Sequence, residues 1–150
     1  MTNFVGIIEG EKLLVKVGDG AVPEVFTHPC LINTTRGVNF TSNDTTTEVA
    51  DCDNPQNPSK VVRKIRSIDF AVSGAGKLHK TDALAYINWW NSGIAKNVQI
   101  VQNDTGANGG WTGSGSMLLK DFAITGIKGD YQDCTINLIP AAPFSFVANA

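Results

Sequence analysis

The chain has few of the residues that build disulfide, membrane or secreted proteins. Its three cysteines, Cys30, Cys52 and Cys134, are odd in number and widely spaced, so we expect reduced thiols, two of them buried as small apolar side chains. No apolar run reaches the roughly 18 residues of a membrane span. The N-terminus lacks the basic and apolar segments of a secretory signal. We therefore expect a soluble protein that is made in a cytosol and has no membrane partner.

Charge and motif content also argue against catalysis and against dedicated nucleic-acid binding. The formal net charge is −2, which leaves no basic footprint for DNA or RNA. His28 and His79 have no second ligand at metal spacing, so we expect both at the solvated surface. The run Gly74-Ala75-Gly76-Lys77 resembles a phosphate loop, but Leu78 follows the lysine, and we interpret the run as a strand-to-helix bend. We predict no catalytic, metal or cofactor site, and hence no enzyme.

Alternating apolar and polar residues indicate a chain that is mainly β. Strands are predicted at Arg36–Ser42, Thr45–Val49, Arg66–Ser73, Lys96–Asn103, Met117–Thr125 and Cys134–Ile139, with a turn at Asn43-Asp44. The length suits a single domain over residues 1–150. The fold class that we expect is an antiparallel β-sandwich or partly rolled β-barrel.

One helix and one long loop interrupt the strands. The helix is predicted over about Asp82–Asn91, with Thr81 as its N-cap. Its core stripe is predicted to hold Ala83, Ile87 and Trp90. The segment Ala50–Ser59 carries two prolines and four Asn or Asp residues, so it is predicted to be a loop, and loops of this length are usually functional or disordered.

The tryptophans and a basic run each have two interpretations. Trp89 and Trp90 could stack a ligand, or one could enter the core while the other meets a second subunit. The basic residues Lys60, Arg63, Lys64 and Arg66 could form a solvated face or meet an acidic neighbour.

Several segments together resemble the major tail tube protein of long-tailed, non-contractile phages and of related gene-transfer agents. They are SIDFAVSGAGKL, the helix TDALAYINWWNSG, KNVQIVQND, the early GVNFTSNDTTTEVADCD and the closing pair SMLLKDFAITGIKGDYQD and CTINLIPAAPFSFV. The resemblance covers roughly Glu11 to Val147 and lies in the pattern of elements, with no invariant motif.

The resemblance implies a structural virion protein whose six copies form a ring. Rings then stack into a hollow tail tube, through which DNA passes without specific binding. Further implied partners are a tape measure protein, a tail terminator and distal tail proteins. Assembly would take place in the bacterial host cytoplasm, and the termini at about 1–8 and 144–150 would be flexible or ordered on assembly.

On this basis two sets of residues are predicted to act in assembly. The predicted contacts between rings or subunits are Asp51, Asp53, Asn54, Gln56, Asn57, Trp89, Phe144 and Phe146. The predicted lumen-lining residues, chosen by strand alternation, are Asn39, Thr41, Glu48, Ser67 and Asp69.

Two rival functions stay open at this point. One is the tube protein of a contractile tail or of a type VI secretion-like system. The other is a small β-sandwich module that binds carbohydrate through Trp89, Trp90 and Trp111.

Overall fold

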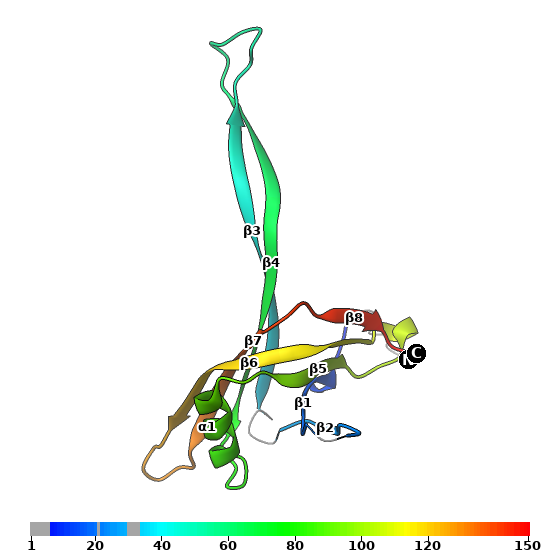
Figure 1. The fold of residues 1–150 in the computed structure, drawn as a ribbon, viewed down its shortest axis with the longest axis vertical. Helices are drawn as coiled ribbons and strands as arrows, with labels where there is room; N and C mark the ends of the chain where they lie inside the picture. Colours follow the sequence, from blue (N-terminus) through cyan, green and yellow to red (C-terminus); the bar gives the residue numbers. More distant parts are fainter. Residues whose placement is uncertain (1–6, 21, 30–33) are drawn as a thin grey trace. The chain divides into compact units, whose positions relative to one another are not determined.

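The computed structural model describes residues 7–20, 22–29 and 34–150 and divides the chain into two compact units. Unit 1 comprises Met1–Val38 and Ala71–Ala150, and unit 2 comprises Asn39–Phe70. Figure 1 shows the elements of both. The assignment of residues 1–150 to one domain stays a prediction.

The described elements include eight strands, one α-helix and two short 3-10 helices, Gly10–Lys12 and Gly106–Asn108. The strands are β1 (Leu13–Gly18), β2 (Phe26–Thr27), β3 (Thr35–Val49), β4 (Lys60–Lys77), β5 (Lys96–Gln102), β6 (Trp111–Thr125), β7 (Asp133–Pro140) and β8 (Ser145–Ala148), and the helix is α1 (Ala83–Ser92). The strands form one antiparallel sheet in the order β2-β1-β5-β6-β7-β4-β3, with β8 also paired to β6, and this sheet is not closed into a barrel. The predicted mainly β class with one flanking helix is confirmed.

Three strands are longer than the sequence predicted. β3 runs through Asn43-Asp44, where a turn was predicted, and β6 begins at Trp111 instead of Met117. β4 includes Gly74 and Gly76, so the predicted bend is wrong. Gly74 pairs with Ile136 of β7, and the rest of this stretch of β4 is aligned with β7 in the same ladder. The partner strand thus holds a glycine-rich segment whose own β propensity is low.

The core of unit 1 lies on one face of its sheet. Strand pairing aligns Val15 with Ile100, and Val72 with Leu138, and all four side chains are fully buried. A register shift between Leu119 and Asp121 reverses the alternation in β6. Phe122 therefore continues the apolar face beside Ile136. In β7 the buried residues Cys134, Ile136 and Leu138 alternate with Thr135 and Asn137, as the sequence pattern of this strand indicates.

Helix α1 packs against β6, but through a different stripe from the predicted one. The buried helical residues are Tyr86 and Trp89, and the Tyr86 ring stacks on Phe122 at 6.0 Å between centroids. Ile87 and Trp90 are exposed instead. The helix begins one residue later than predicted, after Asp82 instead of Thr81, and it ends at Gly93 in the left-handed region with φ of 67°.

Trp89 anchors the C-terminal end of α1. Its side chain is 4% exposed, and its indole Nε1–H donates to the Ile94 carbonyl at 2.8 Å. The Lys96 ammonium lies 5.3 Å from the centre of its ring, within cation–π range. These contacts lie within one protomer, so they leave little of Trp89 for a neighbouring subunit, and the predicted contact at this residue needs correction.

The cysteines and histidines differ in their surroundings. Cys134 is buried, and desolvation followed by the charge of Asp133 raises the pKa of its thiol. Cys52 is exposed, and Cys30 lies outside the described residues. His28 is partly buried with Nδ1 at 2.9 Å from the Val15 carbonyl, so the predicted surface position is wrong for it, whereas His79 is exposed.

Candidate assembly surfaces

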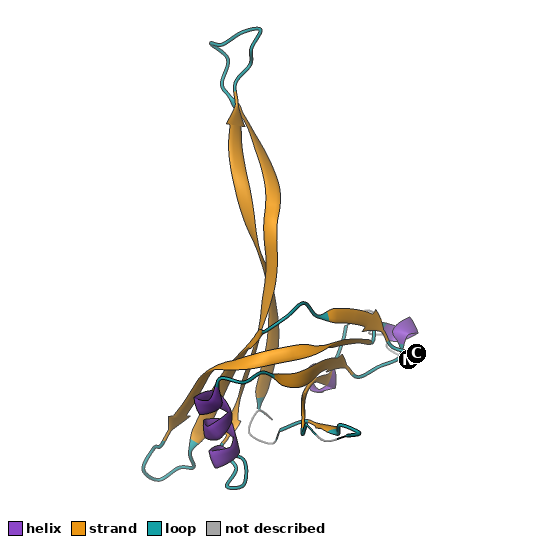
Figure 2. Cartoon of the chain, in the orientation of Figure 1, coloured by secondary structure: helices purple, strands orange, loops and turns teal. Residues whose placement is uncertain are grey.

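Unit 2 is a two-stranded ribbon formed by the paired strands β3 and β4, with a loop joining them (Figure 2). The rings of Phe40 and Phe70 lie 5.7 Å apart, and the Asn43 amide donates to the Ser67 hydroxyl at 3.2 Å. Most of its apolar side chains are solvent-exposed, including Ile65 and Ile68. A two-stranded ribbon alone is marginally stable in water, so such exposure is typical of a surface that is covered on assembly.

The loop of unit 2 occupies residues 50–59, as predicted, because β3 ends at Val49 and β4 begins at Lys60. Asp51 organises the loop. One carboxylate oxygen accepts the backbone N–H groups of Asp53 and Asn54 at 3.0 and 3.2 Å, and the other accepts the Asn57 amide at 3.1 Å. The Asn57 bond, followed by the backbone bonds, lowers the pKa of Asp51. The exposed loop thus has a defined local structure, as a contact surface requires.

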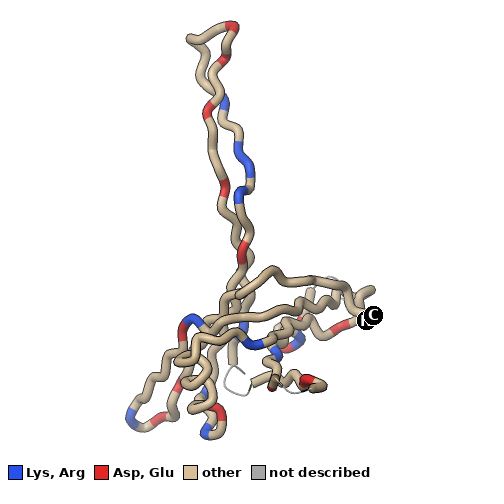
Figure 3. Tube along the Cα trace, viewed as in Figure 1, with Lys and Arg blue, Asp and Glu red and all other residues tan. Residues whose placement is uncertain are grey.

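Charges on the ribbon are largely sorted by strand. Figure 3 shows Lys and Arg along β4, and Asp and Glu along β3 and the loop, and β4 also carries one acidic residue, Asp69. We call the first set the basic row and the second the acidic row. The basic row is Lys60, Arg63, Lys64 and Arg66, and the acidic row is Asp44, Glu48, Asp51 and Asp53.

The five predicted lumen residues do not share one face of the ribbon. All five are exposed. The Asn43–Ser67 hydrogen bond shows that odd-numbered side chains of both strands lie on one face, and the Phe40–Phe70 pair places even-numbered side chains on the other. By this alternation Thr41 and Asp69 lie with Ser67, as does Asn39, whereas Glu48 lies on the opposite face.

A second polar surface, which the sequence analysis did not single out, lies on the sheet of unit 1 opposite the core. The pairing places Lys16, Gln99, Ser114 and Ser145 in one row across four strands. Asn97 and Ser116 form a parallel pair beside it. We call these six residues the polar sheet face. Its signal in the sequence is the alternation of polar with apolar or glycine residues in KNVQIVQ and WTGSGSM.

The C-terminal strand β8 closes the edge of β6. It pairs with β6 of the same chain, with Phe146 aligned to Gly113 and Val147 aligned to Thr112. A Cβ at Gly113 would lie 2.5 Å from the Phe146 ring, and a Cβ at Gly115 would lie 2.5 Å from the Phe144 ring. The two glycines therefore make room for the two phenylalanines. These rings pack within the protomer, although Phe146 keeps 44% of its surface exposed.

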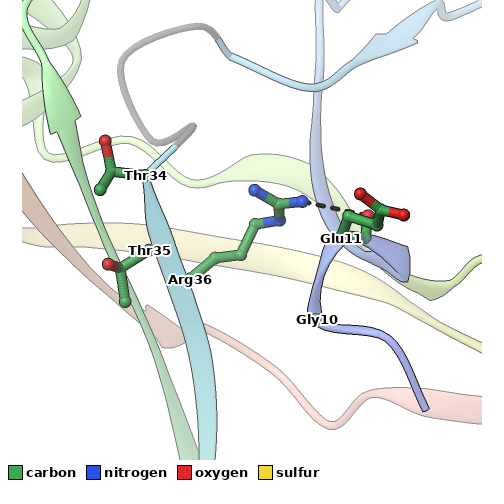
Figure 4. Close-up of a pocket in the computed structure, with 5 residues that line it drawn as sticks. All are labelled: Gly10, Glu11, Thr34, Thr35 and Arg36. Carbon is green, nitrogen blue, oxygen red and sulfur yellow. Dashed lines mark hydrogen bonds between the residues drawn. The ribbon is translucent and has the colours of Figure 1, made fainter.

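A pocket lies between the chain before β1 and the start of β3, lined by Gly10, Glu11, Thr34, Thr35 and Arg36 (Figure 4). The Arg36 guanidinium donates to the carbonyls of Glu11, at 3.1 Å, and of Leu13. The arginine thus ties two backbone segments together. In the described part of the chain no group of His, Cys, Asp or Glu could hold a metal ion. No described helix has the length and apolarity to cross a membrane.

Exposed apolar side chains on an otherwise two-stranded ribbon are typical of a protein that acts within an assembly. A family model described as phage tail tube protein matches residues 7–146. The chain belongs to this family, whose members are structural proteins and not enzymes.

Solved structures share the fold at low sequence identity. The tail of an empty gene transfer agent particle, refined with C6 symmetry, is 19% identical with a TM-score of 0.67, over 95% of this chain and 100% of that one. The SPP1 tail tube is 12% identical with a TM-score of 0.64, and the match covers 95% of this chain and 80% of that one. A chain of the anti-feeding prophage baseplate is 9% identical with a TM-score of 0.60, over 99% and 98%. No curated protein matches the chain in sequence.

Proposed function

We propose that six copies of this chain form a ring and that rings stack into a hollow tail tube that conducts DNA. The observation that carries the proposal is the family match over nearly the whole chain, together with a fold shared with a tail refined in C6 symmetry. A ring requires a head-to-tail contact between neighbouring copies whose repetition returns to the first copy. Stacking of rings requires a second contact, whose repetition continues without end along the tube. The exposed apolar ribbon and the exposed apolar side of α1 supply surface for both.

The polar sheet face is our proposed lumen lining in unit 1. It contains neutral hydroxyl and amide side chains and one cation, Lys16. A lining that carried many cations would bind the DNA phosphates and retard the DNA. Neutral polar groups do not neutralise phosphates, so they do not gain the free energy of counterion release that holds DNA on a basic surface. Of the lumen residues predicted earlier, Asn39, Thr41, Ser67 and Asp69 stay candidates for a second lining segment on one face of the ribbon, whereas Glu48, on its opposite face, does not belong to that segment.

The proposed contacts between subunits are the loop, the ribbon and the outer side of α1. The loop residues Asp51, Asp53, Asn54, Gln56 and Asn57 keep their predicted role, because all are exposed. Trp90, with 55% of its surface exposed, takes the place of Trp89. Phe146 can contact a neighbouring subunit through the part of its ring that stays exposed. Phe144 packs against Gly115 of β6, so we propose that it supports the contact surface from within the protomer.

The wider particle supplies the other proposed partners. A tube of defined length requires a tape measure protein inside it, a terminator at one end and distal tail proteins at the other, and assembly would take place in the host cytoplasm. The second candidate is a tube subunit of a contractile particle. The similarity to a chain of the anti-feeding prophage baseplate favours it, and co-purification with a sheath protein would distinguish the two.

Sedimentation velocity of the purified full chain tests the proposal. We expect the 16.0 kDa protomer to give way, as concentration rises, to a species of six times that mass and then to larger polymers. Negative-stain images of the same samples should show annular rings and tubes. A protomer that stays monomeric at millimolar concentration, or that forms only dimers, would contradict the proposal.

A further inference from the structure

Among the residues that the structure describes, no carboxylate lies within 4.0 Å of a cation of the basic row. Throughout residues 7–20, 22–29 and 34–150, the ion pairs within 4.0 Å are Lys12–Asp104, Lys77–Asp130 and Lys77–Asp133, and all of these lie in unit 1. Four cations within seven consecutive residues repel one another unless opposite charges approach them. Within one ribbon the register places Asp44 opposite Arg66 and Glu48 diagonal to Lys64, yet none of these pairs comes within 4.0 Å. The exposed carboxylates of Asp44 and Glu48 can therefore also meet the basic row of a second copy.

The ribbon also has two open backbone edges. β3 stands at the end of the strand order, and β7 pairs with β4 only from Val72 to Lys77, which is outside unit 2. Open edges with exposed apolar side chains favour pairing with another chain. Val61, Val62, Ile65 and Ile68 supply such side chains, each with 47% or more of its surface exposed.

Ring symmetry decides which edges meet. Neighbouring ribbons related by a sixfold rotation cannot present the same edge to each other, so where two ribbons pair edge to edge, the β4 edge of one copy approaches the β3 edge of the next. We propose that the basic row of one copy pairs with the acidic row of a second copy of this chain, and that this charge match sets the order of neighbours in the assembly. The inference rests on the proposed function, because it needs copies placed side by side by rotation.

Charge reversal of each row tests the pairing. We expect the variants Lys64→Glu/Arg66→Glu and Asp44→Lys/Glu48→Lys to fold but each to assemble poorly alone. Their critical concentrations for assembly should rise by more than about tenfold over that of the unaltered chain, because like charges placed opposite one another repel strongly. An equimolar mixture should assemble again, since alternating copies restore every contact. The chain that carries all four substitutions should assemble with itself.

The control variant Lys120→Glu/Lys128→Glu changes the net charge by the same amount as Lys64→Glu/Arg66→Glu, but on exposed residues of unit 1. It should assemble as the unaltered chain does. In 1 M salt, where the Debye length is about 3 Å, the difference between the reversal variants and the unaltered chain should shrink.

The outcomes separate this inference from the proposed function. If the unaltered chain never assembles, the proposed function fails. If it assembles and either reversal variant does so equally well, the charge pairing fails while the tube function stands. If the mixture stays unassembled although the four-fold variant assembles, the two rows act within one chain, which overturns the pairing between copies.

Discussion

Replacing Trp89 by alanine will lower the free energy of unfolding by about 3–5 kcal/mol, a large share of the stability of a domain of this size. The change removes an indole that is 4% exposed and leaves a cavity between α1 and the sheet. It also removes the donor to the Ile94 carbonyl and the ring partner of Tyr86, whose centroid is 5.7 Å away. Urea denaturation followed by far-UV circular dichroism measures the loss.

Trp90→Ala is the matched control, because the neighbouring indole is 55% exposed. We expect it to change the unfolding free energy by less than about 0.5 kcal/mol, as surface substitutions usually do. If Trp90 lies at a subunit boundary, this variant should nevertheless raise the critical concentration for assembly. Equal losses of stability in the two variants, or a larger loss for Trp90→Ala, would show that Trp90 packs in the core, as the sequence predicted, and would contradict the packing described above.

Deleting Asn54–Asn57 will leave a folded protomer that no longer builds tubes. The deletion shortens an exposed hairpin loop and removes the Asn54 and Asn57 partners of the Asp51 carboxylate, so the strands below it should keep their pairing. A central contact of an interface can contribute 2 kcal/mol or more, so we expect the affinity between copies to fall by about thirtyfold or more. Electron microscopy and sedimentation of the deletion variant measure the effect.

The control replaces the same four residues by Gly-Ser-Gly-Ser, which keeps the length of the loop. It separates the effect of a shorter loop from the effect of losing the side chains. It keeps the span of the loop but removes the side-chain bond to Asp51 and the contact side chains. We expect its assembly to lie between that of the unaltered chain and that of the deletion variant. Tubes of normal length and yield from the deletion variant would exclude the loop as a contact.

The sequence predicted best where local chemistry decides the structure. Proline and Asn or Asp residues fixed the loop at residues 50–59, since they disfavour regular pairing and favour side-chain bonds of the kind that Asp51 makes. Alternation along the strand that begins near Cys134 agrees with the burial of Cys134, Ile136 and Leu138. Gly93 ended the helix as its left-handed conformation allows.

The errors arose where a partner strand or a packed ring outweighs local propensity. Gly74 and Gly76 were predicted to break β4, but β7 pairs along this stretch. Gly113 and Gly115 weaken β6 by propensity, yet their missing side chains leave room for Phe146 and Phe144. Such contacts join residues about 30 to 60 positions apart, so a local reading could not detect them.

The helix stripe shows a different limit. α1 carries apolar residues on several sides, so the spacing of Ala83, Ile87 and Trp90 suited a core stripe as well as that of Tyr86 and Trp89 did. The ring of Phe122 and the carbonyl of Ile94 settled the choice. The register that aligns the polar sheet face across four strands could not be predicted from the sequence either. Alternation indicates which face of a strand a side chain occupies, but it does not indicate which residue of the next strand lies beside it.

The most direct test of the account is a helical reconstruction, by electron cryomicroscopy, of the polymers that the purified full chain forms. We predict six copies per ring, a continuous central channel, and the polar sheet face with Gln99 and Ser114 turned toward that channel. Solid filaments without a channel, rings with a different number of copies, or a channel lined by other faces while Gln99 and Ser114 are buried between subunits would contradict the account.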